Sequence, residues 1–189
     1  SEAFEIVRRR LFESSGELGG QGILARVPPH KDRFGEIIRY LAYQMKALEV
    51  DLRQGVEALA EDVQREKPQA VILDTGAKPV MPSMPGLDKG RYFTAWEVLK
   101  GQASPGKTVA VIGGGLVGCE TAEYLVEKGH RVILLEMLDE LAKDQSPTLR
   151  SELLARLNEY PEVQLRTGTQ VVALDDGSVR ALQGESEIT

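Results

Sequence analysis

Three glycines with the spacing Gly113-x-Gly115-x-x-Gly118 could hold the pyrophosphate of a dinucleotide. In such a motif the first glycine allows a tight turn, the second lets the backbone approach the phosphates, and the third lets a helix pack closely on a strand. An apolar run at residues 108–112 leads into the motif, and a helical pattern leaves it, as a βαβ unit requires. We therefore expect Gly113, Gly114, Gly115 and Gly118 to bind a nicotinamide nucleotide.

A second apolar run, at residues 131–135, ends at Glu136, eighteen positions after Gly118. This is close to the spacing of roughly 20 residues at which an acidic side chain binds the adenosine ribose hydroxyls. A carboxylate repels a 2′-phosphate, and residues 137–140 (MLDE) contain no cation that could hold one. We therefore expect NADH to be preferred over NADPH. The alternative is a simple glycine turn with Glu136 on the surface.

Glu120 lies two residues beyond Gly118, in the expected first turn of the helix. A carboxylate here could stabilise the helix dipole, or it could face the nicotinamide end of a bound nucleotide. Both interpretations remain open from the sequence. His30 and His130 both fall in polar turns, where the sequence places no partner for a metal site or a catalytic triad. We predict no catalytic residue and no metal ligand in this chain.

The elements around the glycine motif alternate between strand and helix. Strands are expected at 108–112, 131–136 and 163–166, and helices at 119–128 and around 149–157. This alternation predicts an α/β fold of Rossmann-like, three-layer dinucleotide-binding units with mainly parallel sheets. A hairpin is expected over residues 171–182, around the turn Asp175-Asp176-Gly177.

The first part of the chain has weaker patterns of the same kind. We expect a strand at 11–13, a helix from 32 to 48, a strand at 50–53, a helix at 60–67 and a buried strand at 69–76. Prolines then mark a connection, which a short helix near residues 94–100 closes. The expected division is a partial FAD-binding-type unit with the connecting segment at 1–104, and an NAD(P)-binding unit that lacks its last strand at 105–189.

The composition narrows the possible functions. The 189 residues carry a formal net charge of −6, which argues against binding to nucleic acid or to an anionic membrane. No apolar run approaches the length of a membrane span, and we expect a cytoplasmic protein. The single cysteine, Cys119, cannot form a redox dithiol or hold an iron–sulfur cluster within this chain, which disfavours a stand-alone disulfide reductase. Electrons that pass here must therefore be carried by an organic cofactor.

Several short motifs together resemble a known family. Glu13, residues 16–21 (GELGGQ), 27–31 (VPPHK) and 74–77 (DTGA) are similar to the FAD-binding unit of flavoproteins with two dinucleotide-binding domains. With residues 113–120 and 135–138, their order resembles the Old Yellow Enzyme-related fusion proteins. These comprise 2,4-dienoyl-CoA reductases, enoate reductases and trimethylamine dehydrogenase. In that family a TIM barrel with FMN and an iron–sulfur cluster precedes this region.

The resemblance implies roles for individual residues. Glu13 would hold the FAD ribose, Gly19, Gly20 and Gln21 would lie along the FAD, and Thr75, Gly76 and Ala77 would close over it. The nicotinamide nucleotide would be served by Gly113, Gly115, Gly118, Glu120 and Glu136. The region takes NAD(P)H and, in the reductases, passes electrons through FAD towards the barrel.

The family's FAD glycine loop would come before Glu13, and it is absent from this sequence. We therefore expect a segment of a larger enzyme that binds FAD weakly by itself. The three arginines at 8–10 are also unusual for a central buried strand. The expected function is the NADH-binding module of a flavin-dependent oxidoreductase that acts on an unsaturated, enoate-like or dienoyl-CoA-like acceptor. Its partners would be NADH, a flavin and the barrel. The alternative is a non-catalytic NAD(H)-binding sensor or interaction domain.

Overall fold

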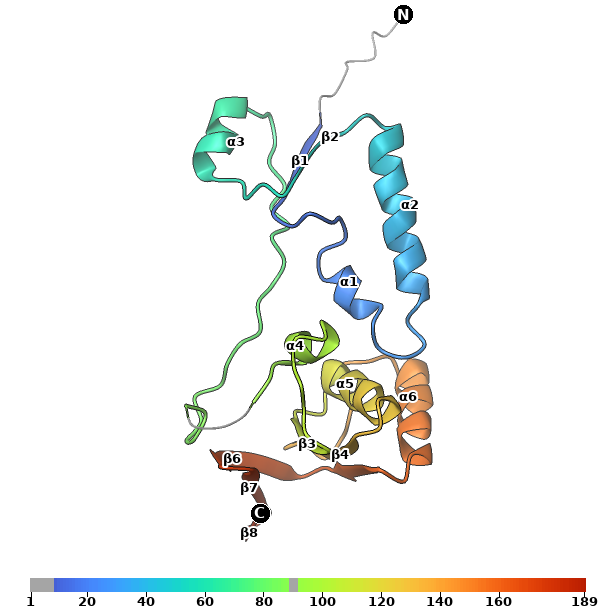
Figure 1. Cartoon of the computed structure of the whole chain (residues 1–189), viewed down its shortest axis with the longest axis vertical. Helices are drawn as coiled ribbons and strands as arrows, with labels where there is room; N and C mark the ends of the chain where they lie inside the picture. Colours follow the sequence, from blue (N-terminus) through green and yellow to red (C-terminus); the bar gives the residue numbers. More distant parts are fainter. Residues whose placement is uncertain (1–8, 89–91) are drawn as a thin grey trace, which may run out of the picture. The chain divides into compact units, whose positions relative to one another are not determined.

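The computed structural model describes residues 9–88 and 92–189, which form two compact units (Figure 1). The first unit contains the described residues up to 26 together with residues 30–78. The second contains residues 27–29 and the described residues from 79 to 189. Among the described helices, none is long and apolar enough to cross a membrane.

The first unit is built on two parallel strands, β1 (Arg10–Glu13) and β2 (Asp51–Gln54). Between them the chain forms α1 (Gly22–Ala25) and the long helix α2 (Arg33–Ala47), and α3 (Ala60–Glu66) follows β2. The register places each residue of β1 opposite the residue 41 positions later in β2. The expected strand at 11–13 and the helices at 32–48 and 60–67 are therefore confirmed within a residue or two.

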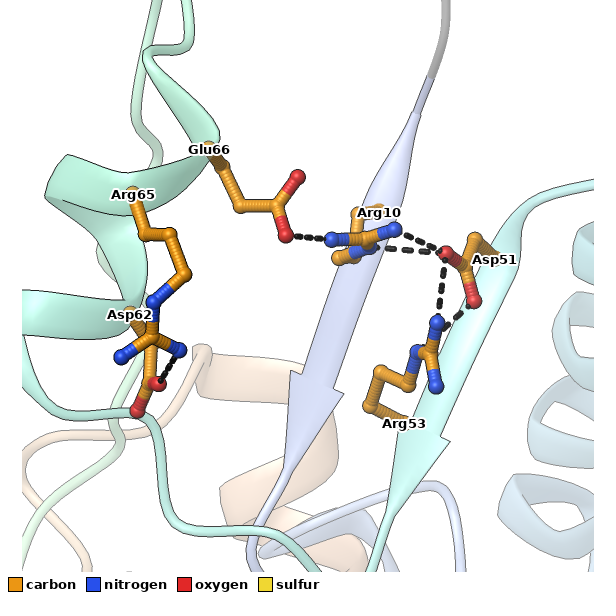
Figure 2. A network of polar contacts seen from close by, with 6 residues as sticks. All are labelled: Arg10, Asp51, Arg53, Asp62, Arg65 and Glu66. Atoms are coloured by element: carbon orange, nitrogen blue, oxygen red, sulfur yellow. Dashed lines mark hydrogen bonds and ion pairs between the residues drawn. The ribbon is translucent and has the colours of Figure 1, made fainter.

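Arg10 does not disturb β1, because its side chain is ion-paired on both sides (Figure 2). Its Nη2 lies 2.6 Å from Oδ2 of Asp51 on β2, and its guanidinium also pairs with Glu66 of α3. Arg53 pairs with the same Asp51 carboxylate, at 3.0 Å. The arginine that looked unsuited to a strand thus links β1, β2 and α3. Arg8 lies outside the described residues.

The prediction of a buried strand at residues 69–76 is wrong. The segment has no regular secondary structure, and all eight residues are exposed, including Ile72 at 91% and Leu73 at 81%. A strand is held by hydrogen bonds to a neighbouring strand, and β1 and β2 pair only with each other in the described structure. The apolar run at 69–76 therefore has no neighbouring strand to pair with in the described structure, and it does not form a strand by itself.

The second unit contains a parallel sheet in the order β3-β4-β5. Helix α5 connects β3 to β4, and α6 connects β4 to β5. This arrangement confirms the Rossmann-like α/β fold. The elements are α4 (Ala95–Leu99), β3 (Thr108–Ile112), α5 (Leu116–Glu127), β4 (Arg131–Leu135), α6 (Pro147–Glu159) and β5 (Val163–Arg166).

The core of this unit lies between the sheet and its helices. Val132 and Leu134 of β4 are buried against α5 and α6. The inner face expected for α5 is confirmed, since Cys119, Ala122, Leu125 and Val126 are all buried. A salt bridge also joins helices α5 and α6, because Arg156 donates two hydrogen bonds to the buried Glu123 carboxylate, at 2.5 and 3.1 Å. On β3, Ile112 remains exposed.

A separate antiparallel sheet follows in the same unit, formed by β6 (Thr169–Asp175), β7 (Ser178–Gln183) and β8 (Ser186–Ile188). Its first two strands are the expected hairpin, which is therefore confirmed. The connecting segment packs on this sheet, because the Leu174 N–H donates to the Pro85 carbonyl at 2.9 Å. Helix α4 likewise belongs to the second unit.

Candidate functional site

The glycine motif forms the turn from β3 into α5. Gly113 has φ +97°, a backbone conformation that favours glycine, and its N–H donates to the Leu135 carbonyl at the end of β4, at 2.9 Å. Gly115 occupies the N-cap position, and α5 begins at Leu116. The N-terminal end of α5, with its positive dipole, therefore opens directly at this loop.

Close packing explains two of the motif's glycines. A side chain at Gly118 would collide with the Gly113 carbonyl oxygen, so that α5 can approach β3 only without one. A side chain at Gly114 would collide with Leu141 and would lie 2.8 Å from Cβ of Glu136. The loop thus has the tight, close-packed geometry that a dinucleotide-binding turn requires.

Glu136 lies against this loop. The residue is 8% exposed; its Oε2 accepts the Gly114 N–H at 2.6 Å, and its Oε1 accepts the Leu138 N–H at 2.8 Å. Its backbone is held by β5 and by the start of β6, since its N–H donates to Arg166 and its carbonyl accepts from Thr169. The structure therefore brings the carboxylate predicted from spacing to the glycine turn, where it also supports the turn itself.

A second acidic residue, Asp144, reaches the same loop, and the sequence analysis missed it. Its Oδ1 accepts the N–H of Leu116, the first residue of α5, at 2.8 Å. The segment that carries it is fastened to the glycine loop, because the Ala142 N–H donates to the Gly114 carbonyl at 2.7 Å. Arg150 of α6 donates to the Leu141 carbonyl at 2.7 Å. The hydrogen bond between Asp144 and Leu116 joins residues 28 positions apart, and no motif spacing predicts it.

Two further groups near the loop differ in what they can do. Helix α5 begins at Leu116, three residues before the predicted start, so the half-buried Glu120 is its fifth residue and lies beyond the first turn in which the sequence analysis placed it. The Cys119 thiol is buried and its Sγ contacts the Gly114 carbonyl at 3.3 Å. Burial raises the pKa of the Cys119 thiol to about 12, so it is a packing residue rather than a nucleophile. Within the described ranges, no group of three or more His, Cys, Asp or Glu side chains could hold a metal ion.

The residues predicted to serve the flavin lie in the first unit. Glu13 ends β1, and its Oε1 accepts the Ser15 N–H at 2.8 Å. Gly19 and Gly20 form the turn before α1, and Gln21 takes its N-cap position. A Cβ at Gly76 would lie 2.9 Å from Nε2 of Gln21, so the structure brings the 19–21 and 75–77 segments together. Thr75 and Ala77 flank this contact; both are exposed and lie outside regular secondary structure.

An open cavity of about 520 Å³ also lies in the first unit. It is lined by α2 residues such as Arg39 and Lys46, by Glu17, and by Leu52 and Gln54 of β2. The predicted flavin residues lie outside its lining. The cavity therefore adds no support to their assignment.

Comparison with known proteins shows what this chain resembles. The family model described as pyridine nucleotide-disulphide oxidoreductase matches residues 6–189. The bilirubin reductase of Mediterraneibacter gnavus is 45% identical over 179 residues, which cover 95% of this chain and 28% of that protein. The NADH oxidase of Thermoanaerobacter brockii is 38% identical, over 94% of this chain and 28% of its own length. The chain thus spans little more than a quarter of these relatives.

Solved structures agree with this result. A 2-naphthoyl-CoA reductase complex superposes with a TM-score of 0.85 at 27% identity, over 96% of this chain and 27% of that one. Histamine dehydrogenase from Rhizobium sp. 4-9 has the same fold, with a TM-score of 0.71 at 22% identity, over 95% of this chain and 30% of its own. The expected resemblance to the Old Yellow Enzyme-related fusion proteins is confirmed.

Proposed function

Because the chain belongs to the pyridine nucleotide-disulphide oxidoreductase family, we propose that it is the NADH-binding module of a flavin-dependent oxidoreductase. In this proposal residues 105–189 bind the nicotinamide nucleotide, and residues 1–104 contribute to a flavin site. The observation that carries the proposal is the contact between Glu136 and the Gly114 N–H, because it places the two parts of the dinucleotide motif side by side.

The second unit offers complementary groups for a dinucleotide. Gly113, Gly114, Gly115 and Gly118 give the pyrophosphate close access to the backbone, and the N-terminus of α5 favours its negative charge. Each oxygen of Glu136 accepts one backbone N–H, which leaves each a second acceptor position for the adenosine ribose hydroxyls. The same carboxylate would repel the 2′-phosphate of NADPH, so NADH is the proposed nucleotide.

The first unit holds the proposed flavin residues. Glu13 would bind the ribose of FAD, and the joined segments at 19–21 and 75–77 would lie along the flavin. When bound, the flavin supplies the acceptor for the hydride of NADH. The chain's residues bind and orient the two cofactors, and none of them is proposed as an acid or base.

The rest of the relatives' length suggests the remainder of the proposed electron path. Relatives named bilirubin reductase and cinnamate reductase are each more than three times as long as the aligned segment. We propose that a barrel with FMN and an iron–sulfur cluster completes the protein, and that the final acceptor is an unsaturated, enoate-like or dienoyl-CoA-like compound. Disulfide reduction within this segment is disfavoured, since Cys119 is its one cysteine and is buried.

Anaerobic mixing of the intact protein with NADH tests this proposal. A rapid loss of the visible absorbance of oxidised flavin is expected, and it should be slower in Glu136→Gln than in the matched control Asp139→Asn. Asp139 is an exposed carboxylate a few residues further along the chain. If NADH binds saturably and the flavin stays oxidised, the chain is a nucleotide sensor or interaction domain instead.

A further inference from the structure

The Asp144 carboxylate occupies the end of α5 that the proposed function gives to the pyrophosphate. Its Oδ1 accepts the Leu116 N–H, a donor at the start of the helix that has no partner inside the helix, at 2.8 Å. Phosphates bind at helix N-termini through such N–H groups and through the positive end of the helix dipole. A carboxylate placed here uses the same donor and the same field as a phosphate oxygen.

The position of this carboxylate relative to Gly115 leads to the same conclusion independently. A Cβ built on Gly115 would lie 3.5 Å from Oδ2 and 3.6 Å from Oδ1 of Asp144. The side of Gly115 that lacks a side chain is thus covered by the carboxylate. In dinucleotide-binding turns, the missing side chain of this second glycine is what lets the backbone approach the pyrophosphate.

The chain can release Asp144 without dismantling the loop. Asp144 is exposed, whereas its neighbours Leu141 and Ala142 are buried. Ala142 stays bonded to the Gly114 carbonyl, and Arg150 to the Leu141 carbonyl, whichever way the Asp144 side chain points. A rotation of one exposed side chain therefore uncovers the Leu116 N–H.

We propose that Asp144 is an internal competitor of the dinucleotide pyrophosphate. In the nucleotide-free chain its carboxylate caps α5 at Leu116, and NADH binds only when this carboxylate moves away. The inference rests on the proposed function, because it takes the glycine loop to be the NADH site. Asp144 thus lowers the affinity for NADH in two ways: its hydrogen bond must be broken, and its negative charge remains near the phosphates.

Calorimetric titration of the intact protein with NADH tests this role, with Asp144→Asn and Asp144→Ala beside the wild type. The asparagine keeps an oxygen that can accept from Leu116 but removes the charge, whereas the alanine removes both. We expect a Kd about tenfold lower for Asp144→Ala, with Asp144→Asn between it and the wild type. Asp139→Asn makes the same change in net charge at an exposed position and should leave Kd unchanged.

A nucleotide-free measurement accompanies the titration. The amide resonance of Leu116 should move in Asp144→Ala and stay in place in Asp139→Asn, because only Asp144 accepts from this N–H in the described structure. An unmoved Leu116 resonance in Asp144→Ala overturns the proposal, as does an unchanged or higher Kd while the wild type binds NADH. Neither of those two results contradicts the proposed NADH site itself. If neither the wild type nor any variant binds NADH, the proposed function fails and the inference falls with it.

Discussion

The Glu136 carboxylate and the Gly114 amide are hydrogen-bonded at 2.6 Å across 22 residues of sequence. This bond fastens the end of β4 to the turn between β3 and α5. The acid that the motif assigns to the ribose therefore also holds the glycine loop in shape. In the proposed site, ligand binding and local stability would depend on the same side chain.

Replacement of Glu136 by alanine should consequently impair more than ribose binding. It leaves the Gly114 and Leu138 N–H groups without their acceptor, and such a loss costs about 1–3 kcal/mol for a buried donor. Urea unfolding followed by the fluorescence of Trp96, the one tryptophan, reports on the second unit, where α4 carries this residue. Asp139→Asn is the control; equal unfolding midpoints for Glu136→Ala and the wild type would contradict the structural role.

Removal of Glu123 or Arg156 should destabilise the second unit. The Glu123 side chain is 1% exposed and Arg156 31%, so the loss of either partner leaves a charge poorly compensated between α5 and α6. We expect Arg156→Met to lower the free energy of unfolding by about 3 kcal/mol. The double replacement Glu123→Leu with Arg156→Leu should recover most of this loss. As a control, Glu127→Gln changes an exposed carboxylate that contacts Tyr160, and its unfolding midpoint should stay close to that of the wild type.

The Cys119 thiol should not react in the folded protein. It is fully buried, and the raised pKa of about 12 keeps it protonated at neutral pH. A colorimetric disulfide reagent should therefore label no Cys119 under native conditions and label it completely in denaturant. Labelling that is fast in the native state would show that α5 does not pack on the sheet as described.

The Arg10–Asp51 ion pair should make the first unit sensitive to acid. The hydrogen bond from Arg10 is the largest cause that lowers the pKa of the Asp51 carboxyl, and Arg53 lowers it further. The pKa of Asp51 in the folded protein lies below its unfolded value of about 3.9. The ion pair therefore stabilises the unit fully at pH values above the unfolded pKa. This stabilisation is lost as the pH falls through the folded pKa.

Hydrogen exchange checks this prediction at the strand itself. The Asp51 N–H donates to the Arg9 carbonyl at 3.0 Å, and its protection should fall from about pH 4 downward, after correction for the intrinsic exchange rate. Asp51→Asn should lower its protection at neutral pH and remove this dependence. Glu61→Gln, an exposed change on α3, should leave it intact. A pH profile shared by Asp51→Asn and the wild type would contradict the assignment.

The strands of the second unit could be predicted well because the sequence patterns that indicate them are local. Turn residues bound the apolar run of β3 and the alternating apolar and polar residues of β5, and the structure places both strands at the predicted residues. Spacing was also sufficient to predict that Glu136 follows a strand beside the glycine loop, because parallel strands end at one edge of a sheet. The register then brings Ile112 opposite Leu135, directly before Glu136.

Features that depend on distant partners could not be predicted in this way. Residues 69–76 have the composition of a strand, but whether they become one is decided by a neighbouring strand. Arg10 looked unfavourable until β2 and α3 brought Asp51 and Glu66 to it. Asp144 has no motif of its own, and its contact with Leu116 arises from the path of the 137–146 segment over the glycine loop.

The most direct test of the central claim is a calorimetric titration with NADH and, separately, with NADPH. The account predicts saturable binding of NADH, weaker binding of NADPH, and a lower affinity for NADH in Glu136→Ala than in Asp139→Asn. Binding of NADPH as tight as that of NADH, or an affinity for NADH that Glu136→Ala does not change, would contradict the assignment of the Gly113–Gly118 loop and Glu136 as the NADH site.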